Sequence, residues 1–171
     1  MNLALIGISH KTAPVRIRER FSFTTRELKE GLEKLKKIDS ARGIVVLSTC
    51  NRMEIYAQLD DLSSGTRGIM QFLLDTFAAG EGEISRYFYR LNGANVVRHI
   101  FKVACGLDSQ ILGETQILGK VKSSREISLQ AESISGLLDN LFIEAVNTGI
   151  QVRALTKISH GNVSIGSAAI K

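Results

Sequence analysis

The feature that most constrains the fold of this chain is a change in hydrophobic periodicity near residue 92. Before this point, apolar runs typical of strands alternate with amphipathic helical segments, and after it the pattern is helical throughout. Strands and helices followed by helices alone are typical of a sheet with helices packed on it. We therefore expect an α/β (or α+β) fold, with a small mixed or antiparallel sheet, packed helices and a helical second half.

The expected elements follow from the spacing of the apolar residues. Strands are predicted over residues 2–9, 44–48, 53–60 and 86–91. A polar segment, residues 10–20, follows the first of them. In the third of these strands, Glu54, Tyr56 and Gln58 lie on the face opposite the apolar one, which predicts a half-exposed strand. Helices are predicted from a cap at Thr24 or Ser22 to residue 38, over 64–79, over 96–104, from near Glu114, and over 137–158.

Composition excludes several classes of protein. The chain is 44% hydrophobic and 23% charged, which is ordinary for a globular domain of 171 residues. Its two cysteines are too few for a disulfide framework, and its apolar runs are too short to span a bilayer. No clustered Cys/His spacing supports a metal site. The net charge of +5 is compatible with a polyanionic partner such as nucleic acid, or simply with a solvated surface.

Cys50 is the sharpest candidate for chemistry. It follows a buried strand, lies in the tight connection 49–52, and has Arg52 two residues further on. A nearby cation lowers the pKa of a thiol toward the reactive thiolate, whereas the alternative is a buried structural cysteine. His99 is a possible partner, because nucleophilic thiols often use a histidine distant in sequence, or it is an ordinary helical residue. Cys105 is expected to be packed in the core.

A second candidate is the polar cluster that contains Ser109, Glu114, Thr115 and Gln116 among glycines. It is either a loop and helix N-terminus that hold a small polar ligand, or an ordinary cap with Asp108 or Ser109 as the capping residue. No G-x-G-x-x-G follows a strand, and the glycines at 161 and 166 lack the Lys-Ser/Thr of a P-loop. We therefore do not expect this chain alone to bind a nicotinamide dinucleotide.

Three long motifs, in the same order, resemble the glutamyl-tRNA reductase family. They are GISHKTAP at residues 7–14 with IRER at 17–20, LSTCNR at 47–52 with Glu54, and GLDSQILGETQ at 106–116. The likeness continues through residues 138–156 and Ser164-Ile165, so it covers essentially the whole chain. Enzymes of this family use NADPH to reduce glutamyl-tRNA(Glu) to glutamate-1-semialdehyde, which is the first step of tetrapyrrole (5-aminolevulinate) biosynthesis.

The resemblance implies roles for individual residues. Cys50 would be the nucleophile that takes the glutamyl group as a thioester, and His99 would be the family's histidine that is important for activity. Arg52 would hold the side-chain carboxylate of the substrate, and Glu114 its α-ammonium group. The full implied substrate-binding set is Thr49, Asn51, Arg52, Ser109, Glu114, Thr115, Gln116 and Lys120, of which Lys120 stands where the family commonly has glutamine.

The resemblance also implies an organisation into domains. Residues 1–158 would be a catalytic, glutamyl-tRNA-binding domain, and residues 159–171 a linker and the start of an NADPH-binding domain that this chain lacks. NADPH would then be bound elsewhere in the full-length enzyme, without a metal. The full-length enzyme would be a homodimer in the cytoplasm (or the chloroplast stroma of a plant), without membrane association, that hands its product to glutamate-1-semialdehyde aminomutase.

For this chain alone we expect substrate recognition and thioester formation, but not the reduction. Two alternatives stay open. One is a tRNA-binding module without chemistry. The other is a thiol-dependent glutamyl-tRNA hydrolase, in which water intercepts the thioester.

Overall fold

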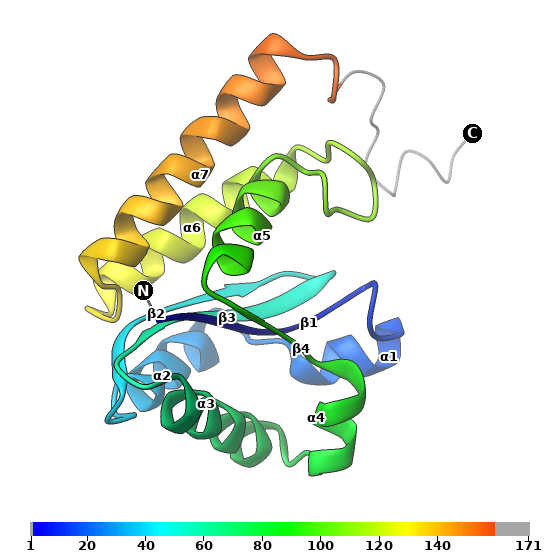
Figure 1. The fold of residues 1–171 in the computed structure, drawn as a ribbon. Coiled ribbons are helices and arrows are strands. Elements are labelled where there is room, and N and C mark those ends of the chain that lie inside the picture. Colours follow the sequence, from blue (N-terminus) through cyan, green and yellow to red (C-terminus); the bar gives the residue numbers. More distant parts are fainter. Residues whose placement is uncertain (1, 160–171) are drawn as a thin grey trace.

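The computed structural model describes residues 2–159 and shows a four-stranded antiparallel sheet between two layers of helices (Figure 1). The order of the strands is β2-β3-β1-β4, and every neighbouring pair is antiparallel. The strands are β1 (Leu3–Ser9), β2 (Ala41–Ser48), β3 (Arg52–Leu59) and β4 (Tyr89–Asn92). The predicted fold class, a small antiparallel sheet with packed helices and a helical second half, is confirmed.

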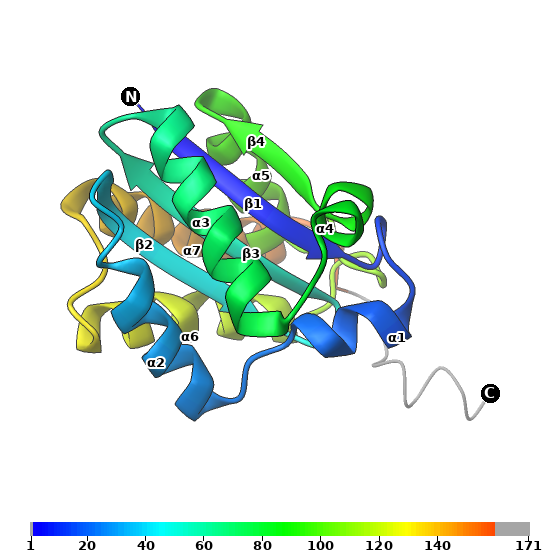
Figure 2. The ribbon, with the colours of Figure 1, turned by 90° about the horizontal axis from the view of Figure 1, so that it is seen from below.

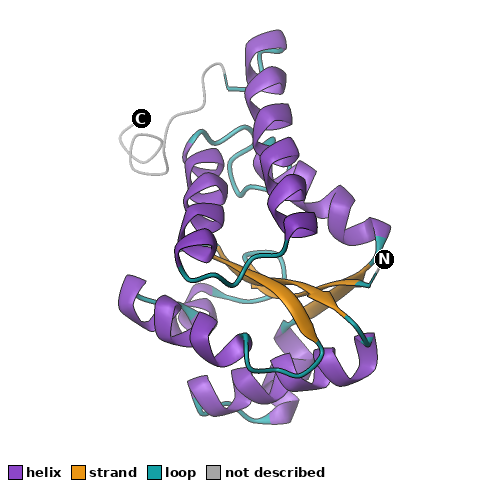
Figure 3. Ribbon diagram, turned by 90° about the vertical axis from the view of Figure 1, so that its left-hand side faces the viewer, coloured by secondary structure: helices purple, strands orange, loops and turns teal. Residues whose placement is uncertain are grey.

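Each face of the sheet is covered by its own helices. The first half of the chain supplies one layer, with α2 (Thr25–Leu35) and α3 (Leu62–Phe77) below the sheet in Figure 1. In Figure 2, α3 lies in front of the central strands and α2 lies near β2. The second half supplies the other layer, which consists of α5 (Ala94–Ala104), α6 (Gln116–Gln130) and α7 (Gly136–Leu155). Figure 3 shows the strands between these two layers. Among the described residues, no helix combines the length and apolarity that a bilayer crossing requires.

Alternation along the strands divides the core in two. On β1, Ala4, Ile6 and Ile8 pack toward α2 and α3, whereas Leu3 and Leu5 pack toward α5, α6 and α7. The sheet is therefore buried on both faces. The prediction that β3 is half-exposed is wrong, because the helices of the second half cover the face that carries Glu54 and Tyr56.

Several predicted boundaries change. The expected strand 86–91 is divided between α4 (Glu81–Tyr87) and β4, because acidic residues in the first turn and Arg86 in the last favour a helix there. The polar segment 10–20 contains α1 (Val15–Arg18) and the start of the 3-10 turn η1 (Glu19–Phe21).

The helix ends also differ from the predictions by a few residues. Thr24, not Ser22, caps α2, through a capping box in which Thr24 and Glu27 each bond the other's backbone nitrogen. Helix α2 ends at Leu35, α6 begins at Gln116, and α7 ends at Leu155. Nearly all of the predicted linker 159–171 lies outside the described residues, including the glycines at 161 and 166 and Ser164-Ile165.

Candidate active site

A cavity of about 300 Å³ lies where the turn between β2 and β3 faces the loop between α5 and α6. We call it the Cys50 cavity. It brings together eight of the ten predicted site residues, and the two not among its lining residues are His99 and Thr115. Two further residues, Gln110 and Ile117, complete it. The lining residues are Thr49, Cys50, Asn51, Arg52, Ser109, Gln110, Glu114, Gln116, Ile117 and Lys120.

The turn between β2 and β3 presents Cys50 to solvent. The Thr49 hydroxyl accepts hydrogen bonds from the backbone nitrogens of Asn51 and Arg52, both at 3.1 Å, and the backbone nitrogen of Thr49 donates to the Arg52 carbonyl at 2.8 Å. These bonds fix the turn around Cys50, whose side chain is exposed. A rigid turn at the end of two buried strands therefore holds an accessible thiol. Cys105, in contrast, is buried as predicted.

Arg52 is buried, and other protein groups already bind its guanidinium. Nη1 lies 2.7 Å from Oε1 of Glu54, and Nη2 donates to Asp108, at 2.6 Å to its carbonyl and 3.0 Å to Oδ2. Burial alone would lower the pKa of Arg52, but Glu54, with smaller contributions from Tyr89, Tyr56 and Asp108, raises it. A substrate carboxylate that approached Arg52 would therefore compete with Asp108 and Glu54.

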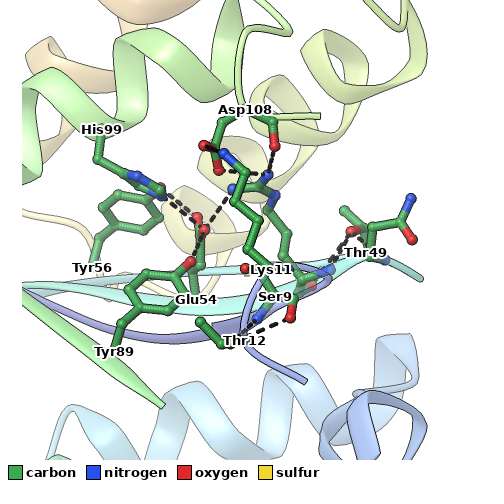
Figure 4. Close-up of polar contacts among 11 residues, drawn as sticks. Ser9, Lys11, Thr12, Thr49, Glu54, Tyr56, Tyr89, His99 and Asp108 are labelled. Carbon is green, nitrogen blue, oxygen red and sulfur yellow. Dashed lines mark hydrogen bonds and ion pairs between the residues drawn. The ribbon is translucent and has the colours of Figure 1, made fainter. Parts of the chain in front are cut away.

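Glu54 is the centre of a buried polar network, the Glu54 network (Figure 4). Its Oε1 accepts hydrogen bonds from Arg52, from the Tyr89 hydroxyl and from Nε2 of His99 at 2.9 Å, and its Oε2 accepts one from the Tyr56 hydroxyl at 2.6 Å. Burial alone would raise the pKa of Glu54, but Arg52, His99 and Tyr56 lower it to about 2. Glu54 is therefore ionised at neutral pH, and its charge is balanced inside the protein.

The backbone of β1 makes room for this network. Gly7 pairs with Glu54 on one neighbouring strand and with Tyr89 on the other. A Cβ at Gly7 would lie 2.8 Å from Cγ of Glu54 and 3.1 Å from the Tyr89 ring. The missing side chain thus lets Tyr89 reach across β1 to Glu54.

His99 connects to the Cys50 turn through this network. In the described part of the chain it makes no hydrogen bond to Cys50, and it does not line the Cys50 cavity. Its ring packs against Tyr89 with 5.8 Å between centroids. Because an ionised carboxylate only accepts hydrogen bonds, Nε2 of His99 carries the hydrogen and donates it to Glu54. The structure therefore relates His99 to Cys50 through Glu54 and Arg52.

Asp108 is a site residue that sequence reasoning considered only as a helix cap. The cap of α6 is Thr115, which is exposed and makes no side-chain capping bond, so the predicted capping role of Asp108 or Ser109 is wrong. Asp108 instead binds Lys11 and Arg52. Burial alone would raise the pKa of Asp108, but Lys11 and Arg52 lower it. Its partners lie 97 and 56 residues away in sequence, so no local pattern could have indicated them.

Two glycines close the loop between α5 and α6. Gly106 and Gly113 have φ of +76° and +75°, and the nitrogen of Gly113 donates to the carbonyl of Gly106 at 2.9 Å. A Cβ at Gly106 would lie only 2.9 Å from Cα of Gly113. This closure brings Glu114 and Gln116 to the cavity opposite Cys50.

The described residues do not fit a nicotinamide dinucleotide or a metal ion. No strand among them leads into a G-x-G-x-x-G turn and a helix N-terminus, the arrangement that binds a pyrophosphate. Residues 2–159 also contain no group of three or more His, Cys, Asp or Glu side chains that could hold a metal. The Cys50 cavity instead surrounds an exposed cysteine with polar residues such as Thr49, Ser109 and Glu114.

Comparison with known proteins identifies relatives along the whole chain. The family described as "Glutamyl-tRNAGlu reductase, N-terminal domain" matches residues 6–156. The chain is 41% identical to glutamyl-tRNA reductase of Picosynechococcus sp. over 171 residues, and 43% identical to that of Bacillus pumilus over 173 residues. Both alignments include 100% of this chain, but only 40% of the first relative and 38% of the second.

A solved structure gives the same result for the fold. Glutamyl-tRNA reductase from Methanopyrus kandleri superposes with a TM-score of 0.75 at 33% identity, over 98% of this chain and 38% of that one. The chain thus spans about two fifths of the length of the proteins it resembles.

Proposed function

The chain belongs to the glutamyl-tRNA reductase family, and from this membership we propose that it binds the glutamyl end of glutamyl-tRNA and takes the glutamyl group onto Cys50 as a thioester. The observation that carries the proposal is the exposed Cys50 thiol on the Cys50 cavity, opposite Glu114 and Lys120. A cysteine side chain is a strong nucleophile in acyl transfer, and a fixed turn holds Cys50 in place.

The proposed step needs no metal and no nucleotide. The sulfur of Cys50 attacks the ester carbonyl of glutamyl-tRNA, a C–S bond forms, and the bond between that carbonyl carbon and the ribose oxygen of the tRNA breaks. The thiol proton goes to the departing ribose oxygen, so that free tRNA leaves with its hydroxyl restored. An aminoacyl ester is already activated toward such attack, and the thioester product is more easily reduced than an ester or a carboxylate.

Charges in the Cys50 cavity match a glutamyl group. Glu114 is the one carboxylate among its lining residues and would hold the α-ammonium of the substrate. Lys120 also lines the cavity, and no described residue binds its ammonium group. Because the guanidinium of Arg52 is bound by Glu54 and Asp108, we assign the side-chain carboxylate to Lys120 first. Arg52 would join only if Asp108 moved away.

The remaining lining residues would complete the binding of the glutamyl group by hydrogen bonds. These are Thr49, Asn51, Ser109 and Gln116. Thr115 lies outside the lining, so no cavity contact supports a direct role for it.

The activity of a whole enzyme of this family goes beyond the described residues. We place the catalytic, glutamyl-tRNA-binding domain at residues 1–158. We assign the next step to other parts of the enzyme, namely the NADPH-dependent reduction of the thioester to glutamate-1-semialdehyde in tetrapyrrole biosynthesis. A homodimer, transfer of the product to glutamate-1-semialdehyde aminomutase and a cytoplasmic or stromal location are further proposals that rest on the family alone.

A second candidate function is hydrolysis of glutamyl-tRNA. Because Cys50 is exposed, water can reach a thioester formed there when no hydride donor is present. The third candidate, binding of tRNA without chemistry, is supported only by the net charge of +5.

Intact-protein mass spectrometry after mixing the chain with glutamyl-tRNA distinguishes the three. The matched variants are Cys50→Ser and Cys105→Ser, which remove the exposed and the buried thiol respectively. We expect one hydroxylamine-labile glutamyl adduct on wild type and on Cys105→Ser, and none on Cys50→Ser. Release of glutamate that depends on Cys50, without an adduct, would favour hydrolysis. Salt-sensitive tRNA binding with neither adduct nor release would reduce the chain to a binding module.

A further inference from the structure

The C-terminal end of α7 is bound to the loop that faces Cys50. Arg153, in the last turn of α7, donates through Nη2 to the carbonyl of Glu114 at 3.0 Å. Just beyond the helix, the hydroxyl of Ser159 donates to the carbonyl of Gly113 at 3.2 Å. Residues at the end of α7 thus bind two consecutive carbonyls of the loop. Arg153 is 39 residues from Glu114 in sequence, and Ser159 is 46 residues from Gly113.

Arg153 also joins this loop to the end of α5. Its Nη1 donates to the carbonyl of Ala104, the last residue of α5, at 2.8 Å and to that of Gly149 at 2.9 Å. A cation is favoured at the C-terminus of a helix, where carbonyls lack intrahelical partners. Gly149 permits the approach of the two helices, because a Cβ there would lie 2.8 Å from the Ala104 carbonyl oxygen.

The bonds of Arg153 are directional and partly buried. Burial lowers the pKa of Arg153, and three carbonyls from three parts of the chain accept its hydrogen bonds. Only a guanidinium offers several donors in one fixed plane, so lysine would reproduce this arrangement in part.

Glu114 is the residue through which Arg153 reaches the site. Glu114 is one of the residues that line the Cys50 cavity, while its backbone carbonyl is bound to Arg153 and its nitrogen to the carbonyl of Ile111 at 3.1 Å. The position of the carboxylate relative to Cys50 therefore depends on where α7 holds this backbone.

We propose that Arg153 is a positioning residue for substrate binding: by fixing the Glu114 carbonyl to the ends of α5 and α7, it sets where the Glu114 carboxylate meets the glutamyl group. The inference rests on the proposed function for the identity of the ligand. It goes beyond that function by placing a determinant of substrate affinity on α7, among residues that do not line the cavity.

The test compares Arg153→Met and Arg153→Lys with the matched control Arg125→Met. Arg125 ties α6 to α7 by an ion pair with Asp139 at 2.7 Å, but neither residue lines the Cys50 cavity. Thioester formation is followed over a range of glutamyl-tRNA concentrations. Losing a hydrogen bond from a charged donor costs enough free energy for about a tenfold change in affinity. We expect the half-saturating concentration to rise about tenfold in Arg153→Met, less in Arg153→Lys, and not at all in Arg125→Met.

Two further readouts separate positioning from a general loss of structure. The rate at which iodoacetamide alkylates Cys50 should be the same in all folded variants, because the hydrogen bonds of Arg153 go to Ala104, Gly149 and Glu114 and not to the turn 49–52. Amide hydrogen exchange of residues 109–116 should increase in Arg153→Met but not in Arg125→Met. An unchanged half-saturating concentration in folded Arg153→Met, or unchanged exchange in that segment, would overturn the proposal. If wild type formed no thioester but the exchange rose as expected, the proposed function would fail while the positioning of Glu114 would stand.

Discussion

Arg52 and Glu54 form an ion pair with 2.7 Å between Nη1 and Oε1, and their side chains are only 1% and 0% exposed. They are two residues apart on β3 and so point to the same face of the sheet. Cys50, two residues earlier, is exposed. The chain thus passes within four residues from an accessible thiol to a fully buried carboxylate.

The first prediction concerns the charge of Glu54. Glu54→Gln keeps the size of the side chain but leaves Arg52 with Asp108 as its one carboxylate partner within residues 2–159. Breaking a buried pair strands a charge, so we expect the free energy of unfolding to fall by about 3–5 kcal/mol in urea titrations. The control is Glu30→Gln, which removes an exposed partner of Arg26 and should leave the urea midpoint unchanged. Equal midpoints for the two variants would contradict the buried pair.

The second prediction is loss of stability in acid. The pKa of Glu54 is about 2 in the folded chain, below its usual 4.5, so the unfolded chain binds the proton more tightly. The contribution of Glu54 is therefore complete above about pH 4.5 and is lost as the pH falls toward 2. Urea midpoints measured from pH 7 downward should fall more steeply below pH 4.5 for wild type than for Glu54→Gln. Parallel curves would show that Glu54 does not carry this dependence.

The third prediction concerns the two thiols. Cys50 is exposed, whereas Cys105 is only 4% exposed and burial raises the pKa of its thiol. A thiol reagent such as DTNB should therefore modify one cysteine quickly in the native chain and the second only after unfolding. Cys50→Ser should remove the fast phase and Cys105→Ser the slow one. Two fast thiols in wild type would mean that the environment of Cys105 is open.

The fourth prediction uses two glycines. Gly7→Ala places a methyl group 2.8 Å from Cγ of Glu54, and we expect overpacking to cost about 1–3 kcal/mol. Gly119 is in the interior of α6 with open space around it. Because alanine has the higher helix propensity, Gly119→Ala should raise the free energy of unfolding by about 0.5–1 kcal/mol. Thermal unfolding should thus shift in opposite directions. A rise in Tm for Gly7→Ala would contradict the close packing of Glu54 and Tyr89 against Gly7.

The fifth prediction tests how His99 acts. If His99 affects Cys50 only through Glu54, then His99→Ala and Glu54→Gln should slow thioester formation by the same mechanism. The double variant should then be about as slow as the slower single variant, which is a strongly non-additive cycle. Additive effects would instead indicate that His99 acts on the substrate independently of Glu54.

Much of the site could be predicted from the sequence. The motifs at 47–52 and 106–116 contain seven of the eight predicted residues that line the Cys50 cavity, and the eighth, Lys120, follows the second motif by one helical turn. The sequence also placed Cys50 in a turn between strands and Cys105 in the packed core. These inferences succeeded because hydrophobic period, turn residues and motifs are local properties of the chain.

The sequence alone determined which residues share a face of a strand or a helix, and so it placed Glu54 and Tyr56 together on β3. Only the tertiary structure decided what covers that face. Helices α5, α6 and α7 turn an apparently solvated row into the buried Glu54 network, with partners such as His99 and Tyr89 that are 45 and 35 residues away. Alternation fixes the direction of a side chain, but burial and charge balance depend on segments that meet only when the layers pack.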